Sequence, residues 1–212
     1  MSIFSKLFNH TLDFLLPHVC MKCNASGSLL CEKCLLDTPN ASPTEHSFIH
    51  AVFDYRNPTI KNAIWRFKYR NSRSIAKCFS KQLYEDIIAE VGEDVDAHIR
   101  EKFLLVPIPL HATRKRERGY NQSELLAQAL LACDTASIFE FAPNILSRAR
   151  NTTPQARSEK RSARIKNLQG AFTAHDHARI RGRSIILIDD VTTTGATLLA
   201  AKQALSPAKP RK

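Results

Sequence analysis

Hydrophobic positions along this chain follow two periods. Residues 103–106 and 184–189 are short, nearly continuous apolar runs, which is the pattern of strands buried on both faces of a sheet. Apolar residues at helical spacing recur over residues 1–16, 58–67, 75–87, 121–133 and 195–205. A further short strand is predicted at residues 48–55. Because strands alternate with helices, we expect an α/β fold with a parallel sheet flanked by helices.

A polar stretch with two prolines, residues 37–47, is the best candidate for a domain boundary. We therefore expect an N-terminal helix and a small module over residues 1–45, and the main α/β domain over residues 46–205. Residues 206–212 form a basic tail of proline, lysine and arginine that cannot be a central strand, because proline has no N–H to donate. We expect this tail to be disordered and to leave the domain shortened at its end.

Four of the six cysteines fall in two C-x-x-C pairs close together in the sequence. The pairs are formed by Cys20 with Cys23 and by Cys31 with Cys34. Two such pairs supply the four thiolate ligands that tetrahedral Zn²⁺ prefers, so we predict a structural zinc knuckle or ribbon. The alternative is a disulfide or a redox-active pair, which a reducing compartment disfavours. Cys78 and Cys133 lie in helical apolar patterns and are expected to be buried side chains.

The segment most informative about chemistry follows the second apolar run. This run ends in two carboxylates, Asp189 and Asp190, and leads into a loop of small hydroxyl residues before a helix begins. Helix N-termini with free N–H groups favour phosphate, and carboxylates accept hydrogen bonds from sugar hydroxyls, directly or through Mg²⁺. The sequence therefore predicts a sugar-phosphate site. Its predicted phosphate-binding residues are Val191, Thr192, Thr193, Thr194, Gly195, Ala196 and Thr197.

The two adjacent carboxylates also have other interpretations. An apolar strand that ends in acids also occurs in P-loop ATPases, but no glycine of this chain is followed by lysine, which excludes a Walker A loop. A purely structural strand–turn–helix remains an alternative, although it explains neither the paired acids nor the cluster of hydroxyl groups.

Composition and charge narrow the class of protein further. The 212 residues are 43% hydrophobic, which excludes collagen-like and disordered chains. No apolar run approaches the roughly 18 residues of a membrane-spanning helix, and residues 1–16 lack the features of an export signal, so we expect a cytoplasmic protein without membrane insertion. The net charge is +11, and residues 114–183 alone carry +8. Such a surface attracts phosphorylated metabolites or nucleic acid without choosing between them.

Arginines in this basic region are candidates for binding pyrophosphate. Guanidinium groups hold such anions with paired hydrogen bonds. Residues 148–166 are polar and cationic, as expected of a loop that closes over an anionic ligand. The candidate anion contacts are Arg114, Arg116, Arg118, Arg148 and Arg150.

These residues together carry a family resemblance. Residues 185–197 resemble the phosphoribosyl-pyrophosphate (PRPP) motif of type I phosphoribosyltransferases. A resemblance to the ComF/GntX proteins, which are linked to competence and DNA uptake, covers nearly the whole chain. It rests on Leu30-Cys31-x-x-Cys34, on Val106-Pro107-Ile108-Pro109-Leu110-His111, on Arg114-x-Arg116-x-Arg118-Gly119-Tyr120-Asn121-Gln122 and on Gly170-Ala171-Phe172.

The resemblance implies a phosphoribosyltransferase-like domain that binds PRPP with Mg²⁺, beside a zinc module, and that acts in DNA uptake or utilisation. It implies displacement of pyrophosphate from the ribose, with Asp189 and Asp190 as the catalytic acids. A second hypothesis is a competence protein that binds single-stranded DNA, with a regulatory or vestigial sugar-phosphate site and no transfer. A third is a zinc protein that only binds partner proteins. The acceptor and the oligomeric state stay open.

Overall fold

The centre of the protein is a parallel sheet. The computed structural model describes residues 18–92, 101–148, 168 and 170–211. The three strands of this sheet stand in the order β2–β1–β5, and both pairs are parallel. A separate antiparallel pair is formed by β3 and β4. The strands are β1 (Phe103–Pro107), β2 (Phe139–Phe141), β3 (Leu146–Arg148), β4 (Phe172–Ala174) and β5 (Ile185–Ile188).

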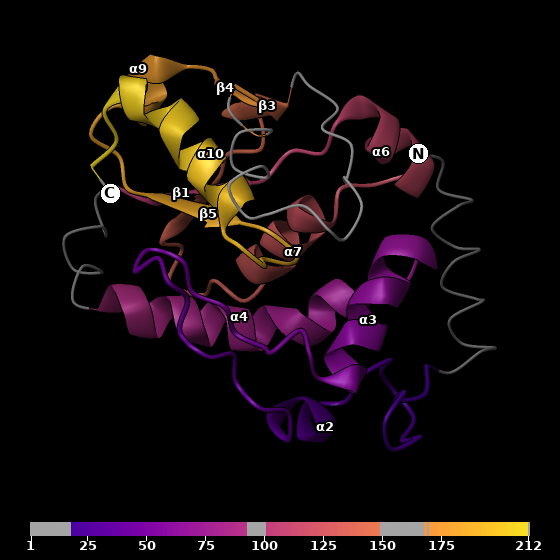
Figure 1. Ribbon diagram of the computed structural model, residues 1–212. Helices are drawn as coiled ribbons and strands as arrows, with labels where there is room; N and C mark the ends of the chain where they lie inside the picture. The colour runs from indigo at the N-terminus through magenta and orange to yellow at the C-terminus, as the bar shows by residue number, and fades with distance from the viewer. Residues whose placement is uncertain (1–17, 93–100, 149–167, 169, 212) are drawn as a thin grey trace, which may run out of the picture.

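Helices flank this sheet on both faces. Figure 1 shows α10 and the β3–β4 pair on one side of it, with α7 and then α4 on the other. The predicted α/β class with a parallel sheet is thereby confirmed. The described helices are α2 (Glu32–Leu36), α3 (Pro58–Tyr69), α4 (Ile75–Val91), α6 (Ala112–Arg118), α7 (Gln122–Leu131), α9 (His177–Ile180), α10 (Ala196–Leu205) and the 3-10 helix η2 (Ser206–Ala208). Within the described residues, no helix has the length and apolar character needed to cross a bilayer.

The central strand β1 contributes to two hydrophobic clusters. Successive side chains of a strand point to opposite faces. Accordingly, Phe103 and Leu105 pack with residues of α3, α4 and α7, whereas Leu104 and Val106 pack with α10 and the β3–β4 pair. All four side chains are buried. Burial of each stabilises the fold by about 1.5–3 kcal/mol, which explains why this run is apolar without alternation.

The start of α3 agrees with its sequence signals. The Asn57 side chain accepts hydrogen bonds from the backbone N–H groups of Thr59 (2.9 Å) and Ile60 (3.3 Å), and Pro58 occupies the first turn. The predicted inward face is buried as expected. The helix predicted at residues 1–16 lies outside the described residues.

The strand predicted at residues 48–55 is wrong. Only an isolated bridge between Asn40 and Phe53 forms there. The chain instead turns back on itself, since the Thr44 hydroxyl lies 2.8 Å from the carbonyl oxygen of His46 and 2.7 Å from that of Ile49. Local side-chain hydrogen bonds of this kind compete with strand pairing. Residues 41–56, named the covering segment below, therefore form an irregular loop that crosses the end of the sheet.

The C-terminal tail differs from the disordered segment that the sequence predicts. Residues 206–208 form η2, and Ala208 is buried. The backbone N–H of Gly182 donates to the carbonyl of Lys209, and that of Arg211 donates to the carbonyl of Arg183. The tail thus packs beside α9 through backbone hydrogen bonds that proline does not prevent.

Candidate functional site

The two predicted catalytic acids lie directly beyond the end of β5, and three elements hold them. The Ser123 hydroxyl, at the start of α7, donates to Asp189 Oδ1 over 3.1 Å. The backbone N–H of Asp190 donates to the same oxygen over 2.9 Å. The Lys68 ammonium, near the end of α3, lies 3.0 Å from Asp190 Oδ2. Both carboxylates, named the acidic pair, are thus oriented before any ligand arrives.

Burial has shifted the protonation of this pair. Burial and then the charge of Asp190 raise the pKa of Asp189 to about 7, although hydrogen bonds and the Lys68 charge act in the opposite direction. Two carboxylates this close disfavour a second negative charge. Near neutral pH the pair therefore carries a proton for part of the time, and a nearby cation favours the doubly ionised form.

A loop suited to phosphate follows the acidic pair. Residues 191–197, named the phosphate loop, lead into α10, and Gly195 is the N-cap with a φ of +72°. This left-handed conformation favours glycine. The Thr194 hydroxyl oxygen accepts from the N–H of Ala196 over 3.4 Å. The remaining N–H groups at the start of α10 and the threonine hydroxyls supply donors for an anion.

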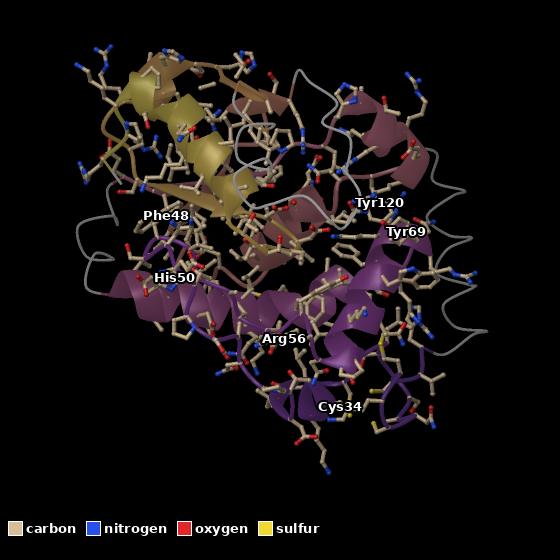
Figure 2. The ribbon with its side chains drawn as sticks, viewed as in Figure 1. Cys34, Phe48, His50, Arg56, Tyr69 and Tyr120 are labelled. Atoms are coloured by element: carbon tan, nitrogen blue, oxygen red, sulfur yellow. The ribbon has the colours of Figure 1, made fainter. Side chains whose placement is uncertain are left out.

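The covering segment packs directly on this loop. A β-carbon placed on Gly195 would lie 2.7 Å from Cδ1 of Ile49 and 2.9 Å from Cδ2 of His46. A side chain at this position would force the ends of the Ile49 and His46 side chains to move, so glycine suits it for space as well as for conformation. Labels on Phe48, His50 and Arg56 mark the course of the covering segment in Figure 2.

Between the covering segment and the end of β5 lies a cavity of about 720 Å³. Its walls come from the covering segment, from α3, α4 and α7, from the acidic pair and from the phosphate loop. A cavity of this size accommodates a small metabolite. Polar lining residues come from both the covering segment and the phosphate loop, and Ile64, Phe79 and Leu83 are among the apolar ones. The cavity therefore offers both polar and apolar groups to a ligand.

Of the described candidate arginines, only some lie near the acidic pair. Arg148, on β3, lies near both Arg114 and Asp189: burial and the Arg114 charge lower the pKa of its guanidinium, and the Asp189 charge raises it. The Arg118 guanidinium instead donates a hydrogen bond to Gln122 Oε1 over 2.9 Å and lies over the ring of Tyr69. Arg116 is exposed on α6. Arg150, with the rest of the predicted closing loop, lies outside the described residues.

Two residues of this arrangement, Lys68 and Ser123, are not among the candidate site residues that the sequence predicts. Lys68 had a usable signal. It stands four positions after the buried Ile64, so a charged residue occupies the inward line of α3. A lysine at such a position needs a buried partner, and that partner is Asp190. Ser123 carried no comparable signal, because a serine in the first turn of a helix is common.

The four cysteines of the two C-x-x-C pairs gather at one point, with Cys34 labelled in Figure 2. Their sulfur atoms all lie within 4.8 Å of one another. The Cys23 and Cys31 sulfurs are 3.6 Å apart, close to the roughly 3.8 Å between ligands of a tetrahedral site with 2.3 Å Zn–S bonds. All six cysteines are free thiols. The donor set and its spacing fit zinc.

The thiols of this cluster differ sharply in acidity. Burial opposes ionisation of Cys20, but hydrogen bonds from backbone N–H groups, that of Cys31 first, lower its pKa to about 6. Burial and the neighbouring thiols raise the pKa of Cys34 to about 12. Four thiolates so close together need a balancing dication, which is what a zinc ion supplies.

Comparison with known proteins identifies relatives. No family model matches the chain. Competence protein ComFC of Bacillus subtilis (strain 168) is 33% identical over 155 residues, which cover 73% of this chain and 56% of that protein. DNA utilization protein YhgH of Escherichia coli (strain K12) is 27% identical over 199 residues, which cover 88% of this chain and 82% of that protein. Competence protein F of Haemophilus influenzae is 33% identical over 137 residues, which cover 64% and 56%.

The chain thus spans a little over half the length of the Bacillus and Haemophilus relatives and most of the length of the Escherichia relative. The matched regions cover most of this chain, and a parallel α/β sheet and a four-cysteine cluster accompany them. The chain belongs to the ComF family.

Proposed function

We propose that this protein binds PRPP together with Mg²⁺ at the acidic pair and the phosphate loop. The observation that carries the proposal is the continuity of three kinds of group at one end of β5. The phosphate loop offers N–H and hydroxyl donors for a monoester, and the acidic pair offers acceptors for ribose hydroxyls. Arg114 and Arg148, close enough to repel each other, offer positive charge for a pyrophosphate.

A divalent cation fits the chemistry of the acidic pair. Mg²⁺ is held by one or two carboxylates together with phosphate oxygens and water. Burial first, and then the charge of Asp190, raise the pKa of Asp189, and Asp190 lies against the Lys68 ammonium, so the two adjacent carboxylates favour a nearby cation. Bound there with PRPP, Mg²⁺ would neutralise charge on the pyrophosphate. The residues that would hold it are Asp189 and Asp190.

The reaction class we propose is displacement of pyrophosphate at the anomeric carbon of ribose. The bond from this carbon to the pyrophosphate oxygen breaks, its electron pair leaves with the pyrophosphate, and a bond to the acceptor forms. Arg114 and Arg148 stabilise the departing charge, and the acidic pair positions the ribose. The acceptor enters against the apolar side chains of the cavity, among them Ile64, Phe79 and Leu83. No residue is assigned as a general base.

The names of the relatives support a biological setting for this chemistry. Relatives in three bacteria are named for competence or DNA utilisation. We therefore propose a role in DNA uptake or utilisation, in contact with other DNA-processing proteins and in the cytoplasm, where reduced thiols stay available for zinc. The zinc module over residues 1–45 is structural in this proposal, and residues 46–205 form the phosphoribosyltransferase-like domain.

Isothermal titration of the full chain with PRPP and Mg²⁺ tests the proposal. We expect saturable binding that weakens about tenfold in Thr194→Val, the loss of one hydrogen bond to a charged group. Thr135→Val is the matched control, because Thr135 lies in the turn before β2, at the other end of the sheet. Absence of heat at millimolar PRPP in a folded sample would show that the site does not bind this ligand.

A further inference from the structure

The outward face of α3 exposes two large aromatic side chains. Trp65 is 45% exposed and Tyr69 is 62% exposed, although the opposite face of the same helix is buried. The two residues are one helical turn apart, and their ring centroids are separated by 6.1 Å. Aromatic rings in such a pair are usually buried. Among the residues that the structure describes, these two neighbouring rings thus remain open to a partner.

Guanidinium groups from two separate parts of the chain surround these rings. The guanidinium carbon of Arg70, which follows α3, lies 5.2 Å from the centre of the Trp65 ring. That of Arg118, at the end of α6, lies 5.5 Å from the centre of the Tyr69 ring. These four residues are named the aromatic–arginine surface, and its Tyr69 is labelled in Figure 2.

The charge around this surface is predominantly positive. Residues 57–77, which include α3, contain six Lys or Arg and no Asp or Glu. The neighbouring α6 adds Arg114, Lys115, Arg116 and Arg118 against Glu117. Apart from Lys68, which pairs with Asp190, these cations have no acidic neighbour within residues 57–77, and like charges on adjacent turns repel. Such cations beside two rings suit a polyanion whose flat apolar groups can stack on the rings.

We propose that the aromatic–arginine surface binds single-stranded DNA. Bases of an unpaired strand stack on aromatic rings, and the guanidinium groups contact the phosphates between them. A duplex hides its base faces and satisfies only the charges. The surface offers rings and cations but no set of groups to read base edges, so binding is independent of sequence. The proposal does not depend on PRPP binding, since it uses the outward residues of α3 rather than Lys68.

The chain contains its own probe of this contact, because Trp65 is its single tryptophan. Titration of the full chain with a thymidine oligonucleotide of about 16 nucleotides is followed by two signals, the fluorescence of Trp65 and the anisotropy of a dye on the DNA. We expect saturable quenching that matches the anisotropy curve, and weaker binding of a duplex. Binding without any change in Trp65 fluorescence, or no binding, overturns the proposal.

Variants separate stacking from charge. Trp65→Ala and Tyr69→Ala should each weaken binding about tenfold and leave its salt dependence unchanged. Trp65→Phe, which keeps a stacking ring, should retain most of the affinity. Arg70→Ala and Arg118→Ala should instead flatten the salt dependence, by about 0.7 in log–log slope for each phosphate that the variant no longer neutralises.

The matched control is Phe48→Ala. Phe48 is also an exposed ring under a cation, with Lys202 Nζ 3.9 Å from its centre, but it lies on the opposite side of the view in Figure 2. It should bind DNA as the unaltered chain does. If Trp65→Ala, shown by circular dichroism to be folded, binds as tightly as Phe48→Ala, the surface is not the DNA site. Trp65→Ala should also bind PRPP as the unaltered chain does. A failure of the DNA proposal can therefore be told apart from a failure of the PRPP proposal.

Discussion

The ammonium of Lys68 lies 3.0 Å from the carboxylate of Asp190, and the two side chains are only 18% and 11% exposed. This ion pair connects α3 to the end of β5, where the candidate site lies. A buried charge without its partner is costly. Lys68 therefore compensates the charge of two adjacent carboxylates at one strand end. In the absence of ligand, its ammonium supplies the positive charge that a bound cation would otherwise provide.

Replacement of Lys68 should show this dependence. Lys68→Met removes the charge and keeps the length of the side chain, so Asp190 is left without compensation. We expect the free energy of unfolding at pH 7 to fall by about 2 kcal/mol, less than for a fully buried pair, as measured by urea denaturation. The control is Lys61→Met, an exposed lysine on the same helix. Equal stability of the two variants would show that the ion pair does not stabilise the fold.

The acidic pair should also make stability depend on pH. The pKa of Asp189 is about 7 in the folded protein and near its ordinary value of 3.8 when unfolded. Between these values the folded state binds more protons, so stability falls as pH rises, by up to about 1.4 kcal/mol per pH unit. Asp189→Asn should remove this part of the pH dependence. Urea denaturation from pH 4 to pH 8 checks it, and parallel curves for the two proteins would contradict it.

Two glycine replacements separate backbone strain from the packing of the covering segment. Gly195→Ala and Gly119→Ala both place a side chain at positive φ, at +72° and +77°, which costs roughly 1–2 kcal/mol. Only at position 195 would the new atom meet other atoms, those of Ile49 and His46. We expect Gly195→Ala to be the less stable variant by urea denaturation and the only one that loses PRPP binding. Equal behaviour would place the covering segment elsewhere in solution.

The cysteine cluster predicts a metal content. Protein purified without chelator should contain about one zinc per chain, as measured by atomic emission. Cys31→Ser or Cys34→Ser should abolish zinc retention and lower the melting temperature. Cys133→Ser, outside the cluster, should retain the metal. Zinc-free protein, or zinc retained after loss of either ligand, would rule out this site.

Local signals in the sequence were enough for much of the fold. The uninterrupted run of β1 predicts burial on both faces, and the structure places its side chains in two separate clusters. The Asn57 cap and the inward face of α3 can be predicted from residue types and their spacing alone. The two C-x-x-C pairs predict a cluster because short connectors keep the ligands together. In each case the evidence lies within a few neighbouring residues.

What the sequence did not reveal depends on contacts between distant segments. The covering segment has strand-like residues, but turns around Thr44 and packing on Gly195 decide its path. The partner of Lys68 comes from the other end of the chain. The contact of Arg118, a predicted pyrophosphate-binding residue, with the ring of Tyr69 also joins separate segments. Each of these outcomes is set by tertiary packing, which local patterns do not encode.

The central claim is that residues 191–197 receive the phosphate of a ribose whose hydroxyls face Asp189 and Asp190. A crystal structure of the full chain grown with PRPP and Mg²⁺ measures this most directly. The account predicts electron density for the 5′-phosphate against the first N–H groups of α10, with the pyrophosphate toward Arg114 and Arg148. Density for the ligand at another place, or crystals in which Ile49 and His46 still close the loop and no ligand is bound, would contradict it.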